Sequence, residues 1–207
     1  GKKIKLSEIN KLFVRIESIF SEKKKKLTNE LWNQKDIFLI TYTDSIKKDK
    51  QKNFKTLSQF LNTFCREFEY IHLLPFFPFS SDDGFAVKDY KKISIEHGDW
   101  SDFKKVAKNF KIMIDLVINH CSAENYLFKN FLDNKEPGKN FFIVNDQKFK
   151  ESLKIIRPRS SELSKKIEIN GKYKYVWCTF SHDQVDLNFR NTEVLIFFLE
   201  IIKFYLD

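Results

Sequence analysis

Two short segments of this 207-residue chain combine carboxylates, aromatic rings and a histidine in a way that suits sugar chemistry. In the first segment, Asp82 and Asp83 precede Gly84 and Phe85, just after an apolar run. Carboxylates accept hydrogen bonds from sugar hydroxyls, and an aromatic ring packs against the C–H face of a pyranose. The same residues also fit an ordinary polar turn, in which Gly84 relaxes the backbone and Phe85 packs in the core. The residue types alone leave both interpretations open.

The second segment places polar side chains at the end of an apolar run, residues 112–118. In a strand, Asp115, Val117 and Asn119 would point to one side, and His120 would begin the following loop. Buried polar groups need partners, which favours a hydrogen-bonded core network for Asp115 and Asn119. His120 is placed to donate to a substrate hydroxyl, although a lone histidine is as often structural.

These segments belong to a regular alternation of apolar runs and helical periodicity. The short continuous runs are typical of strands buried on both faces of a parallel sheet, and the helix at 101–110 is expected to have Ser101 as its N-cap. Strands are predicted at 37–42, 70–74 and 112–118, and helices within 1–32 and at 57–68, 101–110 and 191–205.

The alternation predicts an α/β fold with the polar residues just after each strand, where barrels and open α/β sheets build their sites. Turn signals and a possible strand at 173–177 interrupt the pattern and indicate an inserted loop subdomain after the third strand. We expect four parts: a helical extension (1–36), three strands with their helices (37–120), the insertion (121–180), and a third barrel helix before any fourth strand (181–207).

Several motifs, in order, resemble one enzyme family. DLVINH at 115–120 resembles the strand-three signature of the α-amylase clan, glycoside hydrolase family 13, and LLPFFPFSSDDGF at 73–85 resembles its sucrose phosphorylase subfamily. LITYTDSI at 39–46, IRPR at 156–159 and QVDLN at 184–188 agree with that subfamily. The resemblance covers about residues 31–207 and implies the N-terminal part, about three βα units, of a (β/α)8 TIM barrel.

The resemblance implies a retaining reaction of an α-glucoside with inorganic phosphate that yields α-glucose 1-phosphate. By motif, Asp82 and His120 would bind the glucose, Phe85 would stack on its ring, Gln184 would lie at the pocket edge, Arg159 would meet phosphate or the acceptor, and Asp115 and Asn119 would be structural. The clan's nucleophile and acid follow later strands, so no catalytic residue is expected here. The resemblance therefore predicts a fragment, inactive without the C-terminal half.

The acceptor is less defined by these motifs. The FSSDDGF form resembles enzymes that act on glucosylglycerate, glucosylglycerol or sucrose phosphate, and Ile156 stands where sucrose-specific relatives have an aromatic residue. An α-glucoside hydrolase or transglucosidase of the clan, or a non-catalytic glucose-binding remnant, are the alternatives. Asn119 resembles a calcium ligand of true amylases, but no partner ligands are identifiable, so neither a metal nor another cofactor is predicted.

Composition sets the remaining expectations. The formal net charge is +9, but the lysines are scattered and no stacking-and-basic motif accompanies them, which argues against nucleic-acid binding. Cys65, Cys121 and Cys178 lie far apart and are expected to be free thiols. No signal peptide or membrane-spanning run is evident, so a soluble, cytoplasmic protein without membrane partners is expected.

Overall fold

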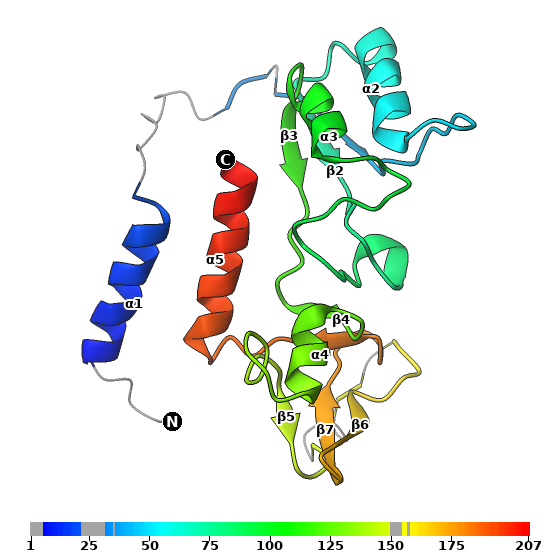
Figure 1. The fold of residues 1–207 in the computed structure, drawn as a ribbon. Helices are drawn as coiled ribbons and strands as arrows, with labels where there is room; N and C mark the ends of the chain where they lie inside the picture. The colour runs from blue at the N-terminus through cyan, green and yellow to red at the C-terminus, as the bar shows by residue number, and fades with distance from the viewer. Residues whose placement is uncertain (1–5, 22–31, 35, 150–154, 157) are drawn as a thin grey trace. The chain divides into compact units, whose positions relative to one another are not determined.

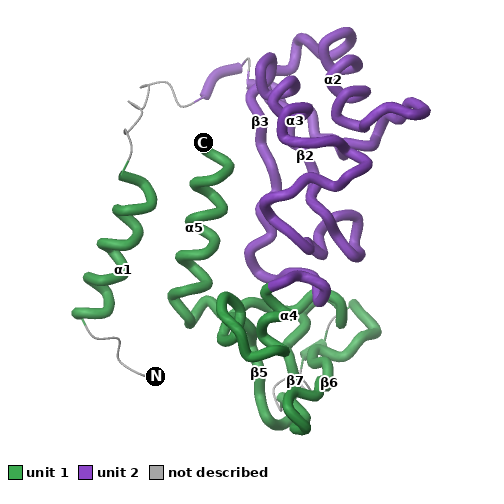
Figure 2. The backbone as a smooth tube through the Cα atoms, viewed as in Figure 1, with its two compact units in different colours: residues 1–27, 127–207 green, residues 28–126 purple. Residues whose placement is uncertain are grey.

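The computed structural model describes residues 6–21, 32–34, 36–149, 155–156 and 158–207. Two compact units make up the chain, and each is described by itself (Figure 2). One unit contains residues 28–126, and the other contains residues 1–27 and 127–207. The four parts predicted from the sequence divide the chain differently from these two units. That four-part division remains a prediction.

The unit of residues 28–126 is built on a parallel sheet with strand order β1-β2-β3 (Figure 1). The predicted parallel strand–helix alternation is therefore confirmed. A turn of 3-10 helix, Asp82–Gly84, follows β2. The elements are β1 (Phe38–Thr41), α2 (Asn53–Phe64), β2 (Tyr70–Leu73), α3 (Trp100–Ala107), β3 (Lys111–Ile114) and β4 (His120–Ser122).

The register of the sheet separates its two faces. Leu39 pairs with Ile71, which in turn pairs with Ile112, and this row belongs to the less exposed face. Phe38 and Ile40 belong to the opposite face and are 47% and 61% exposed. The prediction that each strand is buried on both faces was wrong. In the part of the chain that the structure describes, the more exposed face lacks the cover that a doubly buried strand requires.

Aromatic and aliphatic packing joins α2 and α3 to the segment after β2. Phe54, Leu57 and Leu61 lie on one stripe of α2, and all three are at most 1% exposed. The ring of Phe54 meets Phe76 edge to face at 5.3 Å and Phe103 at 5.8 Å. Such edge-to-face contacts add to the apolar burial that holds the helices in place.

Three local predictions need correction. Helix α3 begins at Trp100, and its N-cap is Asp99, whose carboxylate accepts from the backbone N–H groups of Ser101 and Asp102. Ser101 is therefore not the cap, because the acceptor lies two residues earlier. Strand β3 ends at Ile114, so Asn119 lies outside the strand that was predicted to orient it. The Asn119 side chain is also exposed. His120 begins β4 instead of a loop.

The second unit combines an antiparallel sheet, with strand order β5-β7-β6, and helices. The hairpin of β6 and β7 turns at Asn170 and Gly171, whose φ angles are 51° and 72°. Positive φ at both turn residues matches the twist of a two-residue hairpin, and the Asn-Gly pair supplies it. The elements are α1 (Leu6–Ile19), α4 (Tyr126–Leu132), β5 (Val144–Asn145), β6 (Ser164–Ile169), β7 (Lys172–Trp177), β8 (Gln184–Asp186) and α5 (Thr192–Leu206).

Helix α5 has Asn191 as its N-cap, whose side chain accepts from the N–H of Glu193 at 3.0 Å. The Glu193 carboxylate also forms a two-pronged ion pair with Arg15 of α1, in which Nη2 lies 2.9 Å from Oε2. This hydrogen bond lowers the pKa of Glu193. Helix α1 has no buried residue, and the ion pair is a polar link between these two helices.

The three cysteines are free and buried, as predicted. Within the described ranges, no helix is both long enough and apolar enough to cross a membrane.

Candidate active site

The loop after β2 holds Asp82 and Asp83 in left-handed backbone conformations, with φ angles of 58° and 49°. Gly84 follows with a φ of 102°, and a Cβ at this position would lie 2.8 Å from the carbonyl oxygen of Pro75. The N–H of Phe85 donates to the carbonyl of Asp82 at 3.0 Å and closes the turn. Both carboxylates are exposed, whereas Phe85 is half-buried. The glycine therefore allows a tight turn that presents two carboxylates beside an anchored aromatic residue.

His120 connects β4 to this turn. Its ring is buried, and Nε2 lies 3.1 Å from the carbonyl oxygen of Phe85. A carbonyl only accepts, so Nε2 carries the proton in this contact. The structure thus brings together His120 and Phe85, two residues that the sequence places 35 positions apart.

Tyr90 holds the segment from which His120 projects, and sequence analysis gave it no role. Its side chain is 1% exposed, and its hydroxyl lies 3.0 Å from the carbonyl oxygens of both Val117 and His120. Tyr90 lies soon after the Asp82–Phe85 turn in the sequence. The sequence alone does not show that this tyrosine is buried or which groups its hydroxyl contacts. Only the fold reveals that its hydroxyl fixes the backbone beside His120.

Asp115 lies just beyond the end of β3, where its Oδ2 is 3.1 Å from Nε2 of His72 in β2. The two side chains are 30% and 15% exposed. Tyr42, which directly follows β1, has a raised pKa because of its burial and the carboxylates of Asp83, Asp82, Asp115 and Asp44. The phenol therefore keeps its proton and remains a donor. Polar side chains that follow β1, β2 and β3 therefore interact electrostatically at the carboxyl end of the sheet.

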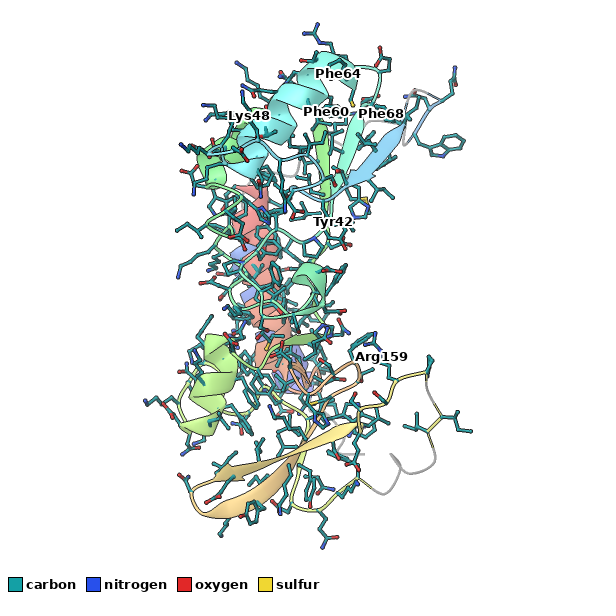
Figure 3. All side chains as sticks on the ribbon, turned by 90° about the vertical axis from the view of Figure 1, so that its right-hand side faces the viewer. Tyr42, Lys48, Phe60, Phe64, Phe68 and Arg159 are labelled. Carbon is teal, nitrogen blue, oxygen red and sulfur yellow. The ribbon has the colours of Figure 1, made fainter. Side chains whose placement is uncertain are left out.

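The unit of residues 127–207 carries the other two predicted site residues. Gln184 is 1% exposed, and its Oε1 accepts from the Ser181 hydroxyl at 2.9 Å. Arg159 is exposed on the segment before β6, where Figure 3 labels it. Its guanidinium carbon lies 5.1 Å from the ring centroid of Phe180, within cation–π range. Asp82, Phe85 and His120 lie in one unit, and Gln184 and Arg159 lie in the other.

The residues that the structure describes contain no group of three or more His, Cys, Asp or Glu side chains arranged to hold a metal ion. Asn119 is exposed, and Arg157 lies outside the described residues.

Comparison with known proteins gives one consistent family. The sequence model of the alpha-amylase catalytic domain matches residues 59–207. The chain is 36% identical over 205 residues to the glucosylglycerate phosphorylase of Escherichia coli (strain K12), covering 97% of this chain and 36% of that protein. It is 40% identical over 173 residues to the glucosylglycerate phosphorylase of Spirochaeta thermophila, covering 83% of this chain and 29% of the relative.

The crystal structure of sucrose 6F-phosphate phosphorylase from Thermoanaerobacter thermosaccharolyticum superposes with a TM-score of 0.75 at 32% identity. The matched region covers 84% of this chain and 38% of the chain in that crystal structure. The chain spans about a third of the length of the curated relatives it matches. These relatives confirm the family that the motifs indicated, and the described sheet is part of a (β/α)8 barrel. The chain belongs to the alpha-amylase catalytic domain family, glycoside hydrolase family 13.

Proposed function

We propose that this chain supplies the glucose-binding side of a retaining α-glucoside phosphorylase. In the first step a carboxylate of the full enzyme attacks C1 of the glucosyl group and forms a covalent bond to it, while the bond from C1 to the oxygen of the partner breaks and that oxygen takes up a proton. Inorganic phosphate then attacks C1, displaces the enzyme carboxylate, and leaves as α-glucose 1-phosphate. The observation that carries the proposal is the contact between His120 Nε2 and the Phe85 carbonyl at 3.1 Å, beside the exposed carboxylate of Asp82.

Each residue of this group has a role in the proposal. Asp82 accepts hydrogen bonds from glucose hydroxyls, because an ionised carboxylate has several acceptor positions. Phe85 offers a ring face to the C–H groups of the sugar. His120 positions Phe85 and contacts the same glucose unit. Asp115 and Asn119 serve the structure of the site, with Asp115 held by His72.

Arg159 and Gln184 complete the proposed substrate contacts. A guanidinium fork matches the oxygens of phosphate, and Arg159 is exposed for such a contact while Phe180 supports its planar group. The QVDLN motif at 184–188 is the basis for assigning Gln184 to glucose binding. The Ser181 hydroxyl holds its Oε1, which fixes the orientation of the amide.

Among possible α-glucosides, we favour glucosylglycerate. The glucosylglycerate phosphorylases of two organisms share 36% and 40% identity with this chain. Ile156 is fully exposed at the position where the sucrose-specific enzymes have an aromatic residue. Sucrose 6-phosphate, glucosylglycerol and sucrose are the other candidates, and a hydrolase of the same family is the alternative reaction.

A chimera tests the proposal, because the chain covers about a third of the Escherichia coli relative. Residues 1–207 are joined to the remaining part of that enzyme and incubated with glucosylglycerate and phosphate, and 31P NMR measures α-glucose 1-phosphate. The Asp82→Asn variant is expected to lower kcat/KM by about a hundredfold or more, whereas the exposed Asp49→Asn control changes it little. Release of free glucose at a rate independent of phosphate would show a hydrolase. Equal kcat/KM for both variants would contradict the role of Asp82.

A further inference from the structure

A pocket of about 630 Å³ lies within the unit of residues 28–126, between the loops that follow β1 and β2 and the loop before α3. Its volume is within the range of about 300–1,000 Å³ that small-molecule sites occupy. Asp82, Phe85 and His120 are not among its lining residues. From the chemistry of its lining we infer that this pocket binds a neutral polyhydroxylated molecule, a sugar or a polyol. The inference goes beyond the proposed phosphorylase activity and does not depend on it.

The first observation is a buried histidine with a fixed donor. His97 lines the pocket and is 6% exposed, and its Nδ1 lies 2.9 Å from Nδ2 of Asn53. The amide nitrogen only donates, so Nδ1 accepts and the proton of the neutral ring sits on Nε2. Burial lowers the pKa of His97 and keeps the ring neutral.

The Nε2–H group is left available to a ligand. The nearest carboxylate that forms a pair with it, Glu96, lies 4.0 Å away, beyond hydrogen-bond range. In the described part of the chain, no hydrogen bond engages this nitrogen. Among the described residues, Nε2 of His97 is not one of the fully buried polar atoms that lack a partner, so it can be reached from the pocket. A ligand hydroxyl can therefore accept a hydrogen bond from Nε2–H in place of water.

The second observation is the sign of the surrounding charge. Asp44, Asp83 and Glu96 line the pocket with a single lysine, Lys47, whose Nζ lies 3.0 Å from Oδ2 of Asp44. Carboxylates accept from hydroxyl groups, whereas an excess of negative charge repels phosphate and carboxylate ligands. The pocket therefore favours a neutral ligand over an anionic one of the same shape.

The third observation is the pair of aromatic rings in the lining, Tyr42 and Phe79. Phe79 is 37% exposed, so its ring is accessible to the C–H face of a sugar. The Tyr42 hydroxyl remains protonated, as described above, and adds a second donor. Two donors, several carboxylate acceptors and two ring surfaces together match a pyranose or a polyol.

NMR titration of the isotope-labelled 207-residue chain tests the inference, with D-glucose as the neutral probe and D-glucuronate as its anionic counterpart. We expect D-glucose to shift the Nε2–H resonance of the His97 ring saturably. D-Glucuronate should bind this pocket at least about fivefold more weakly, since it adds a charge to a negative lining. The absence of a saturable His97 shift, or equal binding of both probes, would overturn the inference.

Variants separate this pocket from the proposed glucose site. Tyr42→Phe should weaken D-glucose binding, measured at the Nε2–H resonance of His97, by about fivefold, the usual effect of one lost hydrogen bond. His97 is left unchanged because its ring provides the measured resonance. Lys48→Ala is the matched control, since Lys48 is exposed on the same loop as Tyr42 and does not line the pocket (Figure 3). Asp82→Asn should leave the His97 shift unchanged, and its loss in that variant would assign the binding to the Asp82 site instead.

Discussion

Replacing Gly84 with alanine should destabilise the unit of residues 28–126 and disturb the turn that presents Asp82. Gly84 has a φ of 102°, and an added Cβ would lie 2.8 Å from the oxygen and 2.9 Å from the Cβ of Pro75. An L-residue at such a φ costs about 1–3 kcal/mol, and a steric clash with backbone costs about as much again. The smaller entropy of the unfolded alanine chain returns about 0.4–1 kcal/mol. The expected net loss in the free energy of unfolding is therefore about 1–5.5 kcal/mol.

Gly171→Ala is the matched control for this loss. Gly171 also has a positive φ, 72°, but nothing lies within 4 Å of the position its Cβ would take. It should lose only about 1 kcal/mol, the cost of the backbone conformation. Urea unfolding followed by circular dichroism measures both variants, and the slope of the transition shows whether the unfolded state has changed. If Gly84→Ala loses no more stability than Gly171→Ala, the contact with Pro75 does not restrict this position.

Three further predictions concern single side chains. Tyr90→Phe should lose about 1–3 kcal/mol in urea unfolding because its hydroxyl serves two buried carbonyls. Tyr70→Phe should change stability by less than about 0.5 kcal/mol, because the hydroxyl of this half-buried tyrosine takes part in an exposed contact with Lys111. His97 has a pKa below the ordinary 6.5, so the unfolded chain binds more protons and stability should fall as the pH drops below 6.5; His97→Gln should flatten that dependence in thermal melts. Arg15→Ala should cost less than about 1 kcal/mol, and salt should reduce the difference, since its ion pair with Glu193 is 46% and 50% exposed.

The strands and helices of the barrel part were predictable because each produces a local apolar pattern. Strand β2 was predicted at 70–74 and is Tyr70–Leu73, and α5 was predicted at 191–205 and is Thr192–Leu206. The predicted third strand was too long, because apolar residues continue through Val117 and Ile118 although pairing with β2 ends at Ile114. An apolar run predicts which residues are buried, but it does not predict where the hydrogen-bonded pairing with a neighbouring strand ends.

Contacts across the fold were not predictable in the same way. Asp82, Phe85 and His120 were selected from their motifs, but the bond from His120 to the Phe85 carbonyl depends on β4, which no hydropathy pattern marks. Tyr90 follows the Asp82–Phe85 motif but was given no role of its own, and His97 belonged to no motif. Their importance arises from burial combined with a particular partner, and both properties exist only after folding.

The exposed face of the parallel sheet links the fold to the proposed site. Ile40 and Met113 are 61% and 47% exposed on this face, and His72 lies between them in register. In a closed (β/α)8 barrel, one face of every strand points inward and is filled by layers of side chains. Here that face carries apolar residues along the strands, and the His72–Asp115 pair lies toward their carboxyl ends. A barrel closed over this face would bury Ile40 and Met113 and exclude water from the pair. The hydrogen bond at 3.1 Å would then strengthen, because electrostatic interactions grow as the local dielectric falls.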